Sequence, residues 1–267
     1  MISVAGPAAL RPVLRSCPPG HPGGQDAELL GPTELERAAA LALGPRATFV
    51  AGRLALRSFA ADLLGVPASE LATHFSCPRC GTGPGLSHGR PGYSLRGKPV
   101  PLALSLARSS GWILLAAVVE PPEGLTIGVD LEDPARLDFD GFDAVALTEA
   151  ERGALAGLSG QALVQERARL WARKEAWLKM TGTGLTTAPD TLDVLRRPEI
   201  RDLAAGEAGL PRNFRAAVAL SPAGYQRPEL TQHSPASAQA AAVAPSRGAR
   251  DAAVPRSPAP WFGQRPG

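Results

Sequence analysis

The order of apolar and polar residues divides the first 225 residues into two long helical regions and several short strand-like runs. Apolar residues recur at helical spacing at Phe49, Leu54, Leu56, Phe59, Leu63 and Leu64, and again at Leu170, Trp171 and Leu178. Runs typical of strands cover residues 100–106, 111–120, 126–132, 191–197 and 213–220. This pattern predicts an α+β fold.

The two helical regions open on similar sequences. "TELERAAALALG" begins at Thr33 and "TEAERGALAGLS" begins at Thr148, and in both an acidic start suits a helix N-terminus with the threonine as cap. Between the regions, "EPPEG" breaks the chain near residue 123. We therefore expect two α+β halves of similar build, residues 1–122 and 123–225; the alternative is a chance similarity between two alanine-rich helices.

The last part of the sequence has a different composition. Residues 226–267 are rich in proline, alanine, serine and glycine and show no apolar periodicity. Such a segment buries too little apolar surface to offset the entropy of ordering. The sequence predicts a disordered tail.

Composition narrows the functional classes only slightly. The net charge of +3 suits an anionic ligand or an acidic partner, but it is too small to predict nucleic-acid binding. Three cysteines fit a reducing compartment better than a disulfide framework. No run approaches the roughly 20 apolar residues of a membrane span, and no signal peptide is evident at the N-terminus. These features predict a cytoplasmic protein that does not bind membranes.

The run "TIGVDLE", residues 126–132, carries the first candidate site. In a strand, Ile127, Val129 and Leu131 face one side, and Gly128, Asp130 and Glu132 face the other. The two carboxylates would lie roughly 7 Å apart along the strand. Like charges this close favour a hard cation such as Mg²⁺ between them; the alternative is a solvated strand face.

A second candidate is "RLWARKEAWLKMTGTGL", residues 169–185. Glu175 and Lys179 are four residues apart and share one helix face. An isolated pair of this kind is an ordinary surface ion pair. The neighbouring Trp171 and Trp177 indicate a packed helix instead, which ends at the glycines of "TGTGL".

Basic residues form a looser set of candidates. The turn-like "SLARSSG", residues 105–111, could bind an anion through hydroxyl and backbone donors, or could be a plain hairpin turn. Further cations are Arg37, Arg46, Arg53, Arg57, Arg90 and Lys98.

The segment "HFSCPRCGTGPGLSHG" contains His74, Cys77, Cys80 and His88. A C-x₂-C pair with flanking histidines is a possible zinc knuckle. The absence of a second C-x₂-C in the sequence and the irregular spacing to His88 favour the alternative, a glycine- and proline-rich loop with reduced thiols.

Taken together, "IGVDLE" at 127–132 and "LWARKEAWLKMTGTGL" at 170–185 resemble the two signature motifs of the 4′-phosphopantetheinyl transferases. The likeness is closest to the larger, surfactin-synthetase-activating type, and a looser likeness extends over residues 28–225. The resemblance implies a pseudo-duplicated, monomeric α+β fold. It also implies that 4′-phosphopantetheine is transferred from coenzyme A to a serine of an acyl or peptidyl carrier protein, with release of 3′,5′-ADP.

The resemblance also implies roles for individual residues. Asp130, Glu132 and Glu175 match the magnesium-binding carboxylates, and Glu175 and Lys179 match the catalytic residues. Positions that match coenzyme A contacts are Arg46, Arg53, Arg90 or Lys98, Arg108, Ser109, Asp130 and Lys179. One departure is Arg108, which stands where the family commonly has histidine, and arginine keeps a permanent cation there.

Two other functions remain open from the sequence. The chain could be a coenzyme A-binding protein that has kept the fold and lost catalysis. It could also be an interaction protein built on a zinc ribbon at residues 74–88.

Overall fold

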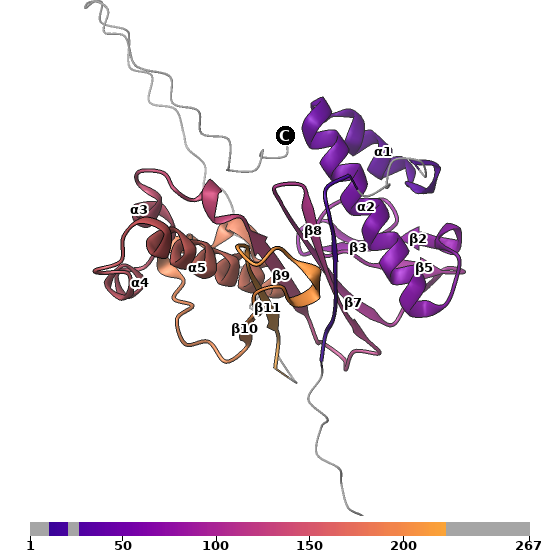
Figure 1. Ribbon diagram of the computed structural model, residues 1–267. Coiled ribbons are helices and arrows are strands. Elements are labelled where there is room, and N and C mark those ends of the chain that lie inside the picture. The colour runs from indigo at the N-terminus through magenta and orange to yellow at the C-terminus, as the bar shows by residue number, and fades with distance from the viewer. Residues whose placement is uncertain (1–10, 21–26, 223–267) are drawn as a thin grey trace, which may run out of the picture. The chain divides into compact units, whose positions relative to one another are not determined.

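The computed structural model describes residues 11–20 and 27–222, which belong to one compact unit (Figure 1). The predicted tail, 226–267, lies outside the described residues. The helices are α1 (Pro32–Ala39), α2 (Leu43–Leu64), α3 (Phe142–Ala146), α4 (Glu149–Ala154) and α5 (Gly160–Thr181). None of the described helices is both long enough and apolar enough to cross a bilayer.

The strands form several small sheets, so the predicted α+β class is confirmed. In the first half the chain has β1 (Val13–Cys17), β2 (Leu71–Thr73), β3 (Phe75–Cys77), β4 (Gly81–Gly83), β5 (Tyr93–Leu95), β6 (Lys98–Pro99), β7 (Leu102–Ser109) and β8 (Trp112–Val119). In the second half it has β9 (Ile127–Glu132), β10 (Ile200–Asp202) and β11 (Arg215–Leu220). The sheet orders are β1-β8-β7, β10-β11-β9, β2-β5-β6 and β3-β4.

Each long helix packs on one three-stranded sheet. Helix α2 contacts β7 and β8, and its buried Leu56 and Phe59 join Leu104 and Leu115 in one apolar cluster. Helix α5 contacts β9 and β11 and buries Leu170 and Leu178 in another cluster (Figure 1). The helical stripes predicted from the sequence are the buried faces of these two helices.

Strands β7 and β9 meet where the two sheets adjoin. Ser105 Oγ of β7 accepts a hydrogen bond from Val129 N at 3.0 Å, and Ser109 Oγ accepts one from Asp133 N at 3.1 Å. Both pairs are 24 residues apart, so the two strands run in the same direction. Serine hydroxyls on one strand thus satisfy backbone donors on the other.

The two halves repeat one local design. Equivalent positions are displaced by 117 residues: the N-caps Gly31 and Thr148, the first residues of the long helices Leu43 and Gly160, and their left-handed C-caps Gly65 and Gly182. The third residue of each short helix, Glu34 or Glu151, is almost fully buried and accepts a hydrogen bond from its N-cap backbone N–H.

Each buried glutamate is neutralised from the following long helix. Glu34 pairs with Arg57 at 3.4 Å, and Glu151 pairs with Lys174 at 2.6 Å. The separation between acid and cation along the chain is the same in both halves. This correspondence supports the prediction of two similar halves, whose boundary near residue 123 stays a prediction.

Thr33 is not the cap that the sequence predicted. Gly31 is the N-cap of α1, and Thr33 lies inside its first turn, whereas Thr148 caps α4 as expected through its side chain. Aligning the two "TE-E-R" sequences therefore pairs residues that are two positions away from the structurally equivalent ones. The sequence motif aligned Glu36 with Glu151, but the buried equivalent of Glu151 is Glu34.

Residues 191–197 do not form the predicted strand. Leu192 and Val194 are buried at alternating positions, which is what made the segment look like a strand. Its backbone donors instead reach side chains, from Val194 N to Glu151 Oε1 and from Leu195 N to Asp193 Oδ1. The strand that pairs with β11 is β10, a few residues later.

Candidate active site

Strand β9 has the predicted alternation. Ile127, Val129 and Leu131 are buried in an apolar cluster with residues of β8. The opposite face does not meet solvent, because α5 packs directly on it. A Cβ atom at Gly128 would lie 1.9 Å from the carbonyl oxygen of Ala176, so only glycine permits this approach.

The close contact brings Lys179 of α5 onto Asp130 of β9. Lys179 Nζ lies 2.6 Å from Asp130 Oδ1 and also donates to the carbonyl oxygen of Val129 at 3.1 Å. Asp130 is 5% exposed, and its other oxygen, Oδ2, has no hydrogen-bond partner among the described residues. A buried acceptor without a donor is rare and favours a ligand at this point.

The three predicted metal ligands perturb one another. Burial raises the pKa of Glu132 to about 9, assisted by the neighbouring Asp130. Burial and the Asp130 charge also raise the pKa of Glu175 to about 7, although Lys179 opposes the change. Burial raises the pKa of Asp130 despite the nearby Lys179. Without an added cation, the site cannot ionise all three carboxyl groups at neutral pH.

This donor set fits a hard divalent cation. It offers carboxylate oxygens, one of which is unsatisfied, and a cation would lower the cost of ionising the group. In the described structure the oxygens of the three residues do not all lie within 4.8 Å of one another.

A cavity of ≈ 270 Å³ opens beside these residues. Glu175, Lys179 and Gly182 line it from α5 and its C-terminal end, and Arg90 and Ser105 line it from the first half. Acid, lysine and arginine thus share one hollow. The two sequence motifs are brought together here, as predicted.

Arg90 and Lys98, the two candidates for one coenzyme A contact, have different surroundings. Arg90 Nη2 donates to the carbonyl oxygen of Met180 at 2.6 Å, at the end of α5. Lys98 is exposed on the short strand β6 and is not part of the cavity lining.

Arg53 and Arg108 lie in a group of arginines that includes Arg37. The pKa of Arg53 is lowered to about 10 by burial, with further repulsion from Arg108 and Arg37. Arg53 also stacks on Phe75, with its Cζ 4.2 Å from the ring centroid, and donates to Ser87 O. Mutual repulsion of neighbouring cations favours binding of an anion. The sequence analysis noted Arg37 only as part of a scattered set.

Arg46 and Ser109 make mainly backbone contacts. Arg46 donates to the carbonyl oxygens of Ala38 and Ala39 at 2.8 Å each, at the end of α1. Ser109 accepts from Asp133 N, as described above. Asp133 in turn accepts from Ser110 Oγ at 2.6 Å and caps a short 3₁₀ turn, so it is not part of the carboxylate group.

Cys77, Cys80 and His88 also come together. Their ligand atoms all lie within 4.8 Å of one another, and His88 Nε2 is 3.3 Å from Cys80 Sγ. His74 does not belong to this group. The sequence favoured a plain loop, but the structure places three possible metal ligands in contact.

The sequence analysis missed the structural role of Lys174. This side chain is fully buried, with Nζ 2.6 Å from Glu151 Oε2 and donating to the carbonyl oxygens of Pro189 and Leu192. The one feature of the sequence that indicated burial was the position of this lysine among large apolar residues. Its partner Glu151, 23 positions earlier, could not be found from spacing alone.

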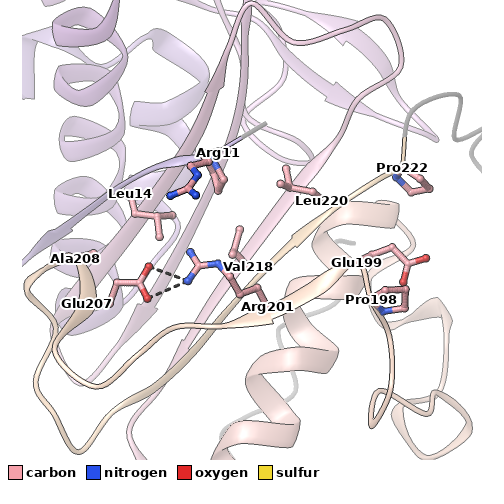
Figure 2. Close-up of a pocket in the computed structure, with 11 residues that line it drawn as sticks. Arg11, Leu14, Pro198, Glu199, Arg201, Glu207, Ala208, Val218, Leu220 and Pro222 are labelled. Atoms are coloured by element: carbon pink, nitrogen blue, oxygen red, sulfur yellow. Dashed lines mark hydrogen bonds and ion pairs between the residues drawn. The ribbon is translucent and has the colours of Figure 1, made fainter. Parts of the chain in front are cut away.

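A second cavity, of ≈ 900 Å³, lies elsewhere (Figure 2). It is bordered by Leu14, Arg201, Glu207, Val218 and Leu220, and Arg201 pairs with Glu207 at 2.9 Å. Val218 is opposite Val129 in the sheet, whereas Ala217 is opposite Asp130. The hollow therefore adjoins the sheet face that points away from the carboxylates.

Comparison with known proteins finds a family likeness for part of the chain. Residues 126–234 match the family model of the 4′-phosphopantetheinyl transferase superfamily. The matched segment contains Asp130, Glu132, Glu175 and Lys179, so the group built by β9 and α5 lies within it.

A relative supports this likeness. The chain is similar to "4′-phosphopantetheinyl transferase 1" of Fusarium mangiferae, with 30% identity over 120 residues. The similarity covers 37% of this chain and 41% of the relative, so the chain spans about two fifths of that relative's length.

Proposed function

We propose that the protein is a 4′-phosphopantetheinyl transferase of the larger, pseudo-duplicated type. It transfers the phosphopantetheine arm of coenzyme A to a serine of an acyl or peptidyl carrier protein. The observation that carries this proposal is the pairing of Lys179 with Asp130 of β9, at the edge of a cavity that Lys179 lines together with Glu175 and Arg90. That constellation lies largely within the superfamily segment.

Binding of coenzyme A uses the cations of both halves. Lys179 and Arg90 are the cavity groups that pair with the pyrophosphate oxygens. Arg53, Arg108 and Arg37 form the second cationic group, which suits the 3′-phosphate because their mutual repulsion is relieved by an anion. Arg46, Lys98 and Ser109 remain candidate contacts of lesser weight, because Arg46 and Ser109 are held by backbone groups and Lys98 lies outside the cavity.

Transfer requires that the carrier serine lose a proton as its oxygen forms a bond to the β-phosphorus. The bond between that phosphorus and the bridging oxygen breaks, and 3′,5′-ADP leaves. Glu175 accepts the proton, because its carboxylate lines the cavity beside Lys179. A carboxylate has two oxygens, so Glu175 can also share in holding a cation.

Asp130, Glu132 and Glu175 hold a divalent cation, for which Mg²⁺ is the expected ion. When bound, this cation supplies positive charge near the pyrophosphate as negative charge develops on the leaving group. Lys179 contributes a second positive charge from the chain itself, held by Asp130 and Val129 O.

The test is intact-mass measurement of several apo carrier proteins after incubation with this protein, coenzyme A and Mg²⁺. We expect each accepted carrier to gain the mass of one phosphopantetheine arm. The gain should disappear for Asp130→Ala and Lys179→Ala. If no carrier gains mass while the protein binds coenzyme A, the protein is instead a binding protein without catalysis.

The protein should be monomeric in the same preparations.

Partner carriers come from polyketide, nonribosomal-peptide or fatty-acid synthesis, and the panel should contain all three kinds. The mildly basic net charge of +3 suits acidic carriers. Cytoplasmic location follows from this partner set.

A further inference from the structure

The hairpin of β3 and β4 and the loop after it bring two cysteine thiols and one histidine imidazole close together. Cys77 ends β3, Cys80 lies in the turn before β4, and His88 lies in the loop after it. Cys77 pairs with Gly81, and Gly81 has a φ of 88° that lets the chain turn sharply behind Cys80. Two thiols and one imidazole converge although 11 positions separate the first from the last.

We propose that Cys77, Cys80 and His88 form a zinc site that is separate from the carboxylate site. Their ligand atoms all lie within 4.8 Å of one another, a spacing that a tetrahedral ion with bonds of about 2.0–2.3 Å can bridge. Thiolate and imidazole ligands select Zn²⁺ over Mg²⁺. The fourth position goes to solvent, because Cys80 is exposed and no fourth His, Cys, Asp or Glu of the described chain joins the group.

The three ligands lie next to Arg90, which lines the cavity from the first half of the chain. Two residues after His88, Arg90 exchanges backbone hydrogen bonds with Ser76, at 2.7 and 3.0 Å. A Cβ at Gly89 would lie 2.4 Å from Ser76 O, so this crossing is tight. The guanidinium of Arg90 then reaches Met180 O at the end of α5.

The residue before His88 has a similar role. The carbonyl oxygen of Ser87 accepts hydrogen bonds from Arg53 at 2.7 Å and from Arg37 at 3.4 Å. A metal at His88 would therefore fix the chain between Arg90 on one side and the carbonyl of Ser87, which binds Arg37 and Arg53, on the other. Without it, the glycine-rich loop 81–89 would be held by the short β3–β4 pairing, the backbone bonds of Arg90 and the hydrogen bonds to its carbonyl oxygens at Pro84 and Ser87.

The metal has a positioning role that rests on the proposed function. By holding the loop, it places Arg90 and the arginine group for coenzyme A. It does not touch the reacting atoms, and Mg²⁺ does not replace it.

The first test measures metal directly. The full chain, purified under reducing conditions, should contain one zinc per molecule. After zinc removal it should bind one Co²⁺ with the visible absorption bands of a tetrahedral thiolate site. Cys80→Ser and His88→Ala should lose these bands, whereas the matched control His74→Ala should keep them. Because Cys80 is exposed, Cys80→Ser should retain the far-ultraviolet circular dichroism of the native protein.

Several results would overturn the metal site: no zinc uptake, cobalt bands that survive Cys80→Ser, or a Cys77–Cys80 disulfide in the reduced preparation. The cobalt titration of the native chain does not depend on any variant folding.

The positioning role is tested by titration with coenzyme A in the absence of Mg²⁺. We expect Cys80→Ser to bind about tenfold more weakly than His74→Ala. Equal affinities would refute the positioning role. If the zinc-loaded native chain does not bind coenzyme A at all, the proposed function fails while the metal site stands.

Discussion

At the residue scale, burial raises the pKa values of the three carboxyl groups of the candidate site, and repulsion from Asp130 adds to the effect at the other two. Glu132 and Glu175 have raised pKa values, and the partner charges facing them are Asp130 and Lys179. Three acids and one lysine leave an excess of negative charge when all ionise. This excess of negative charge is what the proposed divalent cation would neutralise.

The raised pKa values predict how stability depends on pH without metal. The folded protein binds more protons than the unfolded chain between pH 4.5, the ordinary value, and about 7 for Glu175 or about 9 for Glu132. The free energy of unfolding must then fall as the pH rises through these ranges. In chelator, the thermal midpoint of the native chain should fall relative to that of Glu132→Gln/Glu175→Gln as the pH rises. Parallel curves would contradict the prediction.

A single substitution separates proton acceptance from coenzyme A binding. Glu175→Gln keeps the size of the side chain but cannot accept a proton, so we expect transfer to fall by about 10²–10⁴-fold. Coenzyme A affinity measured without Mg²⁺ should change little, because Lys179 and Arg90 are intact. Glu166→Gln, on the same helix and paired with Arg169, is the control and should retain the native rate. Parallel loss of coenzyme A affinity would argue against the assigned role of Glu175.

At the element scale, the fit of α5 on β9 depends on Gly128. Gly128→Ala would place a methyl group on the Ala176 carbonyl and push the helix away, which separates Lys179 from Asp130. We expect a loss of about 3 kcal/mol in the free energy of unfolding, at the upper end for overpacking. Denaturant unfolding measures it.

Gly153→Ala serves as the comparison for this change. Gly153 lies in α4, and a Cβ there would meet nothing within 4 Å. Alanine should leave stability unchanged or raise it by about 0.5–1 kcal/mol, because glycine is unfavourable in helices. Equal effects of the two substitutions would mean that the close approach at Gly128 is unimportant.

The buried pair of Lys174 and Glu151 connects α5, α4 and the segment 189–194. Lys174→Met leaves the Glu151 carboxylate buried without its cation and should cost about 3–5 kcal/mol. Adding Glu151→Gln removes the stranded charge and should restore part of the loss. A double-mutant cycle by denaturant unfolding gives the coupling between the two residues. Additive effects would show that the pair is not coupled.

Elements were predictable where apolar spacing was regular. Helices α2 and α5 and strands β8, β9 and β11 lie where their apolar residues predicted them, because those residues are buried against neighbouring elements. Residues 191–197 failed because burial of alternate residues does not require a strand. Side chains of Glu151 and Asp193 satisfy that backbone, and such contacts are not encoded in local periodicity.

At the scale of the whole molecule, the carboxylates and Lys179 could be found from two motifs, yet their setting could not. The sequence did not foresee that the acidic face of β9 is covered by α5, or that Ser105 and Ser109 link the two sheets. It also gave Arg37 no role, since only the fold brings this residue of α1 close to Arg53 and Arg108.

The described residues contain the complete set of proposed site residues, so the last part of the chain is expected to be dispensable. Deletion of residues 226–267 should leave the rate of carrier modification and the thermal midpoint within a factor of about two and a few degrees of the native values. A large loss of activity in the mass assay would show that the deleted part contributes to the site or to carrier binding.

The constant displacement of 117 residues constrains length as well as composition. One residue more or less in α2 or α5 would rotate everything beyond it by about 100° around the helix axis. Arg57 or Lys174 would then no longer meet its buried glutamate. Alternatively, the C-cap glycine of the helix would no longer lie at the turn. Insertions and deletions should therefore be rare in homologues between residues 31 and 65 and between 148 and 182, while loops outside these windows that contain no proposed site residue should vary in length.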